Sequence, residues 1–447
     1  MERRARTKGN ANQQSMGRAQ NRAAMSQALE RIREAAKERK KERFTALLHH
    51  INIDLLDEAF CELKENAAAG VDGLTWREYE QNLESNLEGL HARIHRGAYR
   101  ALPSRRVYIP KPDGRRRPLA VAALEDKIVQ RATAAVLNAI YEEDFLGFSY
   151  GFRPGRGAHD ALDALAVALT SRKVNFVLDA DIWSFFDTVN HDWLIRFLEH
   201  RIGDRRIMIS PLLANVYLHY VFDLWAERWR RREATGDVII VRYADDFLVG
   251  FQHVADARRF WDDMRKRFEE FSLSLNPGKT RLIEFGRFAA ERRAQRGFGK
   301  PETFNFLGFT FICGRNRRGQ FLIKRITRRD RMRATLREIK EGMRRRMHDP
   351  IPEQGAWIKQ VVRGFFAYYA VPTNGAALRA FYHHVGRFWL RTLLRRSQKD
   401  RLSWSRMQNL TADWLPQPRI LHPYPDKRFA VTHPRWEPCA GIPPARI

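Results

Sequence analysis

The stretch Val238-Ile-Ile-Val-Arg-Tyr-Ala-Asp-Asp-Phe-Leu-Val-Gly-Phe251 decides the fold of this chain. Two apolar runs rich in β-branched residues flank a short polar centre, which is typical of a β-hairpin. The turn places two adjacent carboxylates, Asp245 and Asp246, on an otherwise apolar support. Adjacent acids repel each other and are costly to desolvate, so we expect a hard divalent cation such as Mg²⁺ beside them. A solvated turn rich in Asp is the alternative interpretation.

A second apolar run ends in acids upstream, at Phe176-Val-Leu-Asp-Ala-Asp-Ile-Trp-Ser-Phe-Phe-Asp187. Strand alternation places Asp179 and Asp181 on one face, and Asp181 lies nearer the end of the predicted strand. Asp181 and the hairpin pair would together give three carboxylates, which suffice to hold two metal ions for nucleotidyl transfer. Asp179 and Asp187 are competing candidates, and Asp181 could instead cap the end of a strand.

Charge is unevenly distributed along the chain. The 447 residues carry 80 Lys and Arg against 52 Asp and Glu, a formal net charge of +28. Residues 1–43 hold 13 Lys or Arg and 5 acids, and residues 324–346 hold 11 and 3. A clustered basic excess of this size favours phosphate binding, whereas charge that only keeps a protein soluble would be scattered. The composition therefore predicts a nucleic-acid partner.

The second basic run also has helical periodicity. One face of the predicted helix can pack while the other follows a phosphate backbone, and structured RNA is read through shape, phosphates and 2′-hydroxyl groups. The apolar residues at helical spacing are Ile326, Met332, Leu336, Ile339 and Met343.

The three cysteines, Cys61, Cys313 and Cys439, are far apart in the sequence. They form neither a disulfide framework nor the spacing of a zinc site, which fits a reducing cytoplasm. The N-terminus lacks the apolar core of a signal peptide, and no apolar run approaches the length of a membrane span. We therefore expect a cytoplasmic protein with no membrane partner.

A coarse reading places strands at 106–110 and 117–121, around the hairpin signal Asp113-Gly114. Such a hairpin would bring Lys111 and Arg117 onto one small surface, which is either a phosphate site or a solvated basic hairpin. The Pro-rich segment 415–447 is expected to be mostly loop. Helices are expected over 23–48, 53–66, 79–97, 124–141, 160–171, 211–230, 254–271 and from 324 to about 397.

These segments belong to a longer series of sequence blocks. In order and content the series resembles that of bacterial group II intron reverse transcriptases with maturase activity, over most of the chain. Besides the two aspartate segments, the blocks are Asn66–Trp76, Val107–Leu119, Phe148–His159, Leu273–Phe285, Phe304–Phe309 and Arg363–Tyr369.

The resemblance implies an α/β right-hand polymerase, with reverse transcriptase fingers and palm followed by an all-α thumb, or maturase, domain. The implied boundaries are a basic N-terminal extension at 1–43, fingers and palm at 44–323, the thumb at 324–414 and a Pro-rich tail at 415–447. Many relatives end in a metal-dependent endonuclease domain with paired Cys and His, and we expect none here.

The resemblance also assigns roles within the site. It places Asp181, Asp245 and Asp246 at the catalytic Mg²⁺ ions, and Lys111 and Arg117 on the triphosphate of the incoming dNTP. It places Phe186 under the sugar, where the ring would exclude a 2′-hydroxyl, and Lys279 near the pyrophosphate as a general acid. Without the resemblance, Phe186 reads as a core residue and Lys279 as an ordinary exposed lysine.

The chain departs from the family pattern at one place. Residues 201–208 run directly into 209–220, whereas family members have a few tens of residues between these stretches. That segment carries a Pro-Gln-Gly turn against the incoming nucleotide and the template base. No Pro-Gln-Gly occurs in this chain, and Asp245 follows Asp181 by only 64 positions. We therefore expect a deletion between Met208 and Ile209 that impairs polymerisation.

The implied function is that of an RNA-directed DNA polymerase and maturase. Such a protein binds its own intron RNA, assists splicing, and extends a DNA primer along an RNA template with dNTPs. The missing segment favours an alternative, a non-catalytic RNA-binding splicing factor or decayed relic. A reverse transcriptase recruited to phage defence is a third reading, disfavoured by the maturase-like thumb. The sequence leaves the intron, the DNA target and the oligomeric state open.

Overall fold

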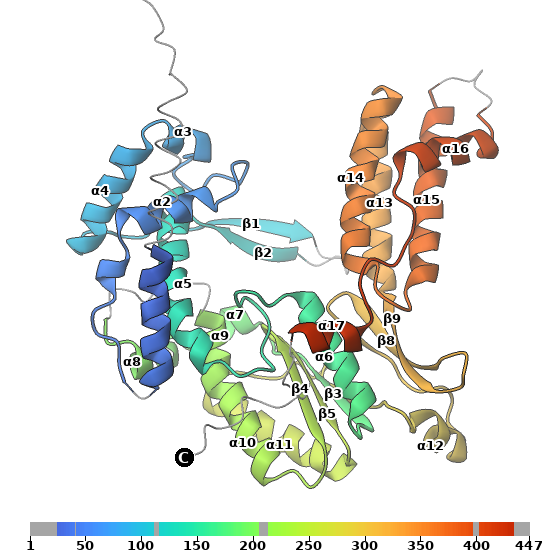
Figure 1. Ribbon diagram of the computed structural model, residues 1–447, viewed down its shortest axis with the longest axis horizontal. Helices are drawn as coiled ribbons and strands as arrows, with labels where there is room; N and C mark the ends of the chain where they lie inside the picture. The colour runs from blue at the N-terminus through green and yellow to red at the C-terminus, as the bar shows by residue number, and fades with distance from the viewer. Residues whose placement is uncertain (1–24, 41, 111–115, 205–212, 397–401, 433–447) are drawn as a thin grey trace, which may run out of the picture. The chain divides into compact units, whose positions relative to one another are not determined.

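The computed structural model describes residues 25–40, 42–110, 116–204, 213–396 and 402–432. Two compact units interleave along the chain, one of residues 1–156, 183–227 and 266–274, the other of residues 157–182, 228–265 and 275–447. Both units combine helices with strands (Figure 1), which confirms the mixed α/β class. The boundaries expected at 43, 323 and 414 stay predictions.

In the first unit α2 packs against both α5 and α4, and α8 packs against α9. Polar caps fix where the shorter helices begin. The Asn52 side chain accepts a hydrogen bond from the Leu55 amide, and Thr75 and Glu78 form a capping box. The elements are α2 (Ile53–Cys61), α3 (Trp76–Glu80), α4 (Leu83–His95), β1 (Arg105–Pro110), β2 (Arg116–Val121), α5 (Leu124–Asp144), α7 (Phe185–Thr188), α8 (His191–Arg201) and α9 (Leu213–Leu218).

Two predicted helices were drawn too long. The described part of the helix expected over 23–48 is helical over 25–38, with a separate 3₁₀ turn at Leu48–His50, and the helix expected over 53–66 ends at Cys61. The helix expected over 211–230 is confirmed from Leu213 onward, as three consecutive pieces: α9, a π-helical stretch at His219–Asp223, and α10 (Leu224–Arg232). The hairpin expected around Asp113-Gly114 is confirmed, with β1 and β2 antiparallel, although its turn lies outside the described residues.

A four-stranded antiparallel sheet supports the candidate site in the second unit. Its strand order is β4-β5-β3-β6, so the strand that precedes Asp181 lies beside the hairpin although many residues separate them in sequence. The β-branched side chains of β4 are buried, as expected for a strand covered on both faces. The strands are β3 (Phe176–Ala180), β4 (Val238–Tyr243), β5 (Asp246–Phe251) and β6 (Arg281–Glu284), and α6 (Ala158–Ser171) contacts β4.

A second sheet, β7-β8-β9, follows in the same unit and corrects one expectation. Residues 324–327 were assigned to a helix, but Ile326 lies in β9, opposite Thr310 of β8. The helix α13 begins only at Arg329. The strands are β7 (Phe304–Phe306), β8 (Phe309–Arg315) and β9 (Phe321–Thr327), and the remaining helices before them are α11 (Val254–Glu270) and α12 (Ala289–Gln295).

The helices from α13 to α16 share one apolar core. Ile339 and Met343 of α13 are buried in it, and Met332 and Leu336 pack against it, so the predicted apolar face is confirmed from Met332 onward. A Cβ added at Gly342 would lie 2.4 Å from the Trp357 ring, so only glycine allows α13 and α14 to approach this closely. The helices are α13 (Arg329–Arg345), α14 (Ile351–Tyr369), α15 (Gly375–Leu394), α16 (Trp404–Trp414) and α17 (Pro425–Thr432).

The Pro-rich segment is not only loop, because α17 packs against α6. Arg428 of α17 makes ion pairs with Asp160 (3.2 Å) and Asp163 (3.6 Å) of α6. Within the described residues, no helix combines the length and the apolar character needed to cross a membrane.

Candidate active site

The hairpin that decides the fold turns within two residues. Tyr243 pairs with Asp246 as the last rung of β4 and β5, which leaves Ala244 and Asp245 as the loop. Ala244 has a φ of 56°, in the left-handed region that side chains rarely adopt. The Arg242 guanidinium is fully buried beneath the turn and donates a hydrogen bond to the Ala244 carbonyl at 3.0 Å. A strained backbone held from below fixes the direction of the two carboxylates.

The register of the sheet brings Asp181 to the same edge. Ala180 of β3 pairs with Phe247 of β5, and one step further along this antiparallel register lie Asp181 and Asp246. Beyond it, Ile182 forms an isolated bridge with Leu275. Two carboxylates from distant parts of the chain therefore lie across from each other at the end of adjacent strands.

The neighbouring acids affect the pKa of the Asp246 carboxyl. The Asp246 residue keeps exposed surface, but burial of its carboxyl by the surrounding protein and the charges of Asp245, Asp181 and Asp179 raise its pKa to about 6. Lys279 acts in the opposite direction and lowers it. A cluster of like charges at one sheet edge is a place where a cation would be stabilised.

Asp181 is held by the turn before Lys279, through Asn276, a residue to which the sequence analysis gave no role. The side-chain amide of Asn276 donates to Asp181 Oδ2 at 3.0 Å, and the Asn276 backbone N–H donates to the Asp181 carbonyl at 2.8 Å. The Lys279 Nζ atom lies 2.8 Å from the same Oδ2. The Asn-Pro-Gly triplet before Lys279 was the available signal, because such triplets mark turns.

The two competing acids have different surroundings. Asp179 faces Arg281 across β3 and β6, with the Arg281 Nε atom 3.5 Å from its Oδ2. Burial raises the pKa of Asp179, and Arg281 counteracts this increase. Asp187 is an exposed residue of α7, in the first unit. Asp181 is thus the acid whose carboxylate meets both Lys279 and Asn276.

The chemistry of the three predicted ligands suits a hard cation. All three predicted ligands are carboxylates, the oxygen donors that Mg²⁺ prefers, and their mutual repulsion calls for positive charge. Among the residues that the structure describes, no group of three or more His, Cys, Asp or Glu side chains is arranged as a metal site. The assignment of Asp181, Asp245 and Asp246 as ligands therefore remains a prediction.

The remaining predicted site residues belong to the first unit. Phe186 is 67% exposed in the short helix α7, whereas Phe185 beside it is 3% exposed. The interpretation of Phe186 as a core residue is therefore wrong, and Phe185 is the ring that is buried. Arg117 lies in β2 opposite Ile109. Lys111 lies outside the described residues.

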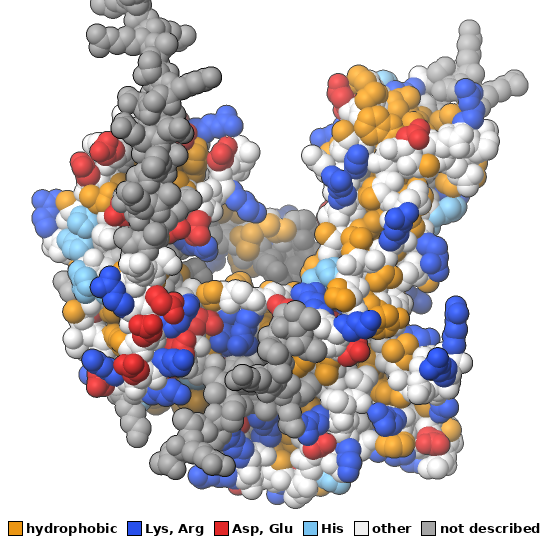
Figure 2. All heavy atoms as spheres, viewed as in Figure 1, with side chains coloured by type: hydrophobic (Ala, Val, Ile, Leu, Met, Phe, Trp, Pro, Cys, Tyr) orange, Lys and Arg blue, Asp and Glu red, His pale blue; other side chains and the backbone are white. Residues whose placement is uncertain are grey.

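Lysine and arginine side chains are spread over the visible face in Figure 2, with acids among them. On α13, Arg329, Arg344 and Arg345 are exposed. Arg328 instead pairs with Asp330 at 2.6 Å, and the Arg346 guanidinium lies 4.7 Å from the centre of the Trp357 ring. The basic run therefore divides into exposed and structurally engaged arginines.

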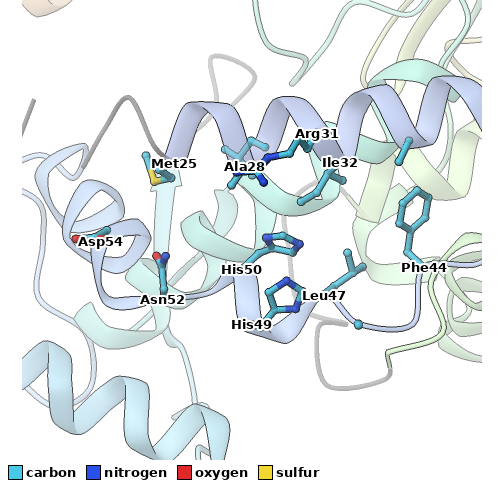
Figure 3. A pocket seen from close by; sticks show the side chains of 13 residues that line it. Met25, Ala28, Arg31, Ile32, Phe44, Leu47, His49, His50, Asn52 and Asp54 are labelled. Atoms are coloured by element: carbon cyan, nitrogen blue, oxygen red, sulfur yellow. The ribbon is translucent and has the colours of Figure 1, made fainter. Parts of the chain in front are cut away.

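A cavity of about 540 Å³ lies in the first unit, apart from the predicted site residues. It is formed between the helical residues 25–38 and the segment that leads into α2 (Figure 3). Ile32 and Leu47 line it with apolar surface, and His49 and His50 supply ring nitrogens. Burial lowers the pKa of His50, with smaller effects from His49 and Arg31.

Comparison with known proteins adds a family match. A family model described as "Reverse transcriptase (RNA-dependent DNA polymerase)" matches residues 109–206 and 207–311. The two matched segments meet two residues before the junction at which the sequence predicts a deletion. They include every predicted site residue, from Lys111 to Lys279.

Individual relatives extend the match. "Protein YkfC" of Escherichia coli (strain K12) is 31% identical over 318 residues, covering 57% of this chain and 78% of YkfC. "Group II intron-encoded protein LtrA" of Lactococcus lactis subsp. cremoris is 28% identical over 222 residues, covering 43% of this chain and 37% of LtrA. The "Putative COX1/OXI3 intron 1 protein" of Saccharomyces cerevisiae is 23% identical over 432 residues, covering 75% of this chain and 51% of the yeast protein.

These alignments also contain gaps. The 318 positions shared with YkfC outnumber the residues in 57% of a 447-residue chain, and the 222 positions shared with LtrA outnumber those in 43% of it. In each of these two alignments, some positions of the relative therefore have no counterpart in this chain. The chain spans about a third to a half of the length of LtrA and of the yeast protein.

Proposed function

This chain belongs to the reverse transcriptases of the group II intron type, and from that premise we propose that it is the RNA-directed DNA polymerase and maturase of an intron. It would bind intron RNA to assist splicing, and would extend a DNA primer along an RNA template with dNTPs. The observation that carries the proposal is the meeting of Asp181 with Asp246 at one sheet edge, beside Asp245 and Lys279.

The three carboxylates are the groups that would hold divalent cations. Bound there, such ions supply charge neutralisation for the triphosphate and a more acidic primer 3′-hydroxyl. The chain's own contribution is direction, because the Ala244 turn and the Asn276 hydrogen bond fix where the carboxylates of Asp245 and Asp181 lie. Fixed charges of this kind stabilise a transition state without reorganising during the reaction.

In this proposal, Lys279 stabilises the negative charge that develops on the leaving pyrophosphate. Its ammonium group contacts Asp181 and also acts on Asp246. As a donor with three N–H bonds, it would hold a proton close to an oxygen that gains charge when pyrophosphate leaves. In the same proposal, Lys111 and Arg117 bind the triphosphate, and the exposed Phe186 ring lies against the sugar.

Binding of RNA follows from charge. The net charge of +28 gives a strong and salt-dependent attraction for phosphate, and Arg329, Arg344 and Arg345 offer exposed guanidinium groups on α13. Guanidinium groups bind phosphate through two parallel hydrogen bonds. We propose that this face of α13 contacts intron RNA.

We propose that the segment carrying the Pro-Gln-Gly turn is missing between Met208 and Ile209, because no Pro-Gln-Gly occurs in the sequence. A chain without the Pro-Gln-Gly turn would lack one wall of the pocket for the nucleotide base, and misplacement by about 1 Å can cost on the order of 100-fold in rate. We therefore propose slow polymerisation with undiminished RNA binding. The same missing segment would favour the second candidate, an RNA-binding splicing factor without polymerase activity.

Incorporation of dNTPs on a primed RNA template with Mg²⁺ tests the proposal. The Asp245→Ala/Asp246→Ala double variant is the blank, and RNA binding by both proteins is measured in parallel. Incorporation above the blank supports the polymerase. Binding without incorporation supports the splicing factor, and loss of both would contradict either function.

A further inference from the structure

Phe152 combines an exposed aromatic ring with an unfavourable backbone. Its side chain is 59% exposed, and its φ is 55°. A bulky residue in the left-handed region is a true outlier, because its Cβ crowds the following carbonyl. Strain of this kind persists only where the surroundings over-determine the conformation, and it is found most often at functional sites.

Arg153 supplies part of that surrounding structure. Its side chain is 1% exposed and makes an ion pair with Glu142 at 2.9 Å. It also donates to the carbonyls of Leu146 and Ser149 at 2.8 and 2.9 Å, and its guanidinium lies 5.2 Å from the centre of the Phe145 ring. The residue after Phe152 is thus anchored on the inner side of the loop.

Two further anchors hold the loop. Arg156 donates to the Gly147 carbonyl at 2.7 Å, and its guanidinium lies 5.5 Å from the centre of the Tyr150 ring. On the other side of Phe152, the buried Asn215 side chain donates to the Gly151 carbonyl at 2.6 Å. Both arginines are thus engaged inside the loop.

The anchoring leaves one group directed outward. Among the described residues, no aromatic ring or cation stacks on Phe152. If Phe152 served only the fold, a glycine would meet the same backbone requirement without strain and without exposing an apolar ring. The ring therefore calls for an occupant from outside the chain.

We propose, given the RNA binding proposed for this chain, that Phe152 is a stacking platform for one unpaired nucleobase of single-stranded RNA. Every base offers a π-face, and stacking of bases on aromatic side chains is the common mode of binding to single strands. A protein partner would need roughly 800 Å² of complementary surface on each side, which a single ring does not supply. The strong positive charge of the chain makes a polyanion the favoured occupant.

The test compares Phe152→Ala, Phe152→Gly and Phe152→Tyr with a matched control, Phe288→Ala. Phe288 is also exposed, at 51%, but has an ordinary φ of −101°. The probes are a single-stranded RNA of about 12 nucleotides containing 2-aminopurine and a fully paired RNA of the same length. Affinity is measured by fluorescence over a series of salt concentrations.

Loss of the ring should weaken single-strand binding by about 5- to 140-fold in the Ala and Gly variants, the range that corresponds to one stacked base. Phe152→Tyr and Phe288→Ala should bind as the wild type does, and paired RNA should show no change. Since no charge is altered, the slope of log affinity against log salt should stay constant. Phe152→Gly should also melt at a higher temperature than the wild type, because it relieves the strain.

The outcomes separate the two proposals. Wild-type binding that Phe152→Ala leaves unchanged would overturn the platform and leave the proposed function intact. A lower melting temperature for Phe152→Gly, or a flatter salt slope, would show that the ring supports the fold or the arginines instead. A wild-type chain that binds neither RNA would overturn both proposals.

Discussion

The ammonium group of Lys279 lies 2.8 Å from Oδ2 of Asp181, and the same carboxylate oxygen accepts a hydrogen bond from Asn276. The contact between Lys279 and Asp181 joins the turn before β6 to the end of β3. Lys279 also lowers the pKa of Asp246 against the effects of burial and neighbouring acids. One lysine therefore links the predicted ligands, and its charge sets how easily they ionise together.

Asp246→Asn should stabilise the protein at neutral pH. The folded-state pKa is about 6, above the ordinary value of about 3.9, so the folded protein binds this proton more tightly than the unfolded chain does. Stability attributable to Asp246 therefore falls as pH rises from about 4 to 6, and the penalty is fully present above pH 6. Chemical unfolding of the wild type and of Asp246→Asn at pH 7.5 and at pH 4 measures the difference in their free energy of unfolding.

The advantage of Asp246→Asn over the wild type should appear at pH 7.5 and vanish near pH 4. Asp187→Asn, at an exposed residue of α7, is the control and should show no such pattern. An equal advantage at both pH values would mean that the charge of Asp246 is not the cause.

Lys279→Met should move this pH window upward. Without the ammonium group, the carboxylates near Asp246 repel each other more strongly, so its pKa should rise above about 6. Lys279→Arg keeps the charge and should leave the window in place. The same unfolding series, run on both variants, locates the midpoint. A midpoint unchanged in Lys279→Met would show that Lys279 does not act on Asp246.

Breaking the buried ion pair between Arg325 of β9 and Asp163 of α6 should strongly destabilise the protein. The two side chains are 2% and 4% exposed and meet at 2.6 Å. Removing Arg325 leaves the buried Asp163 with only the longer contact to Arg428, at 3.6 Å, so the cost should approach the roughly 3–5 kcal/mol of a broken buried pair. Urea unfolding of Arg325→Ala measures the loss. Arg428→Ala should cost less because Arg428 is 25% exposed, and an equal cost would contradict the ranking.

The exposed arginines of α13 should set part of the salt dependence of RNA binding. Replacing Arg329, Arg344 and Arg345 with Ala should weaken binding and reduce the slope of log affinity against log salt by up to about 0.7–0.9 per lost phosphate contact. Arg328→Ala/Arg346→Ala is the matched control, because these two side chains are engaged within the protein. Filter binding at several salt concentrations measures the slope for each variant. An unchanged slope in the triple variant would show that these arginines of α13 do not contact RNA phosphates.

The hairpin and its acids could be predicted because local signals and the fold agree there. Apolar β-branched runs around Ala244-Asp245 allow few other structures. Strand alternation places Asp179 and Asp181 on one face, and the position nearer the strand end favoured Asp181. The pairing of β3 with β5 could not be read from the sequence, because it depends on which strands meet in three dimensions. The hydrogen bond from Asn276 follows from that same arrangement.

Errors arose where tertiary contacts override local pattern. Residues 324–327 continue a basic helical pattern, yet they pair with β8 as a strand. The Pro-rich tail was expected to be mostly loop, and its described part also contains the short helix α17, whose Arg428 contacts acids on α6. The hydrogen bonds of Arg153 and Arg156 likewise depend on carbonyls that only the folded backbone brings together.

The rate of RNA-templated primer extension tests the central claim most directly. Three proteins are compared with Mg²⁺ and dNTPs: the wild type, Asp245→Ala/Asp246→Ala, and a chain with a Pro-Gln-Gly segment of the family type inserted between Met208 and Ile209. We predict slow extension by the wild type above the double-alanine blank, and a rise of about 100-fold or more on insertion. Wild-type extension equal to the blank, with no gain on insertion into a folded chain that binds RNA, would contradict a polymerase site at Asp181, Asp245 and Asp246.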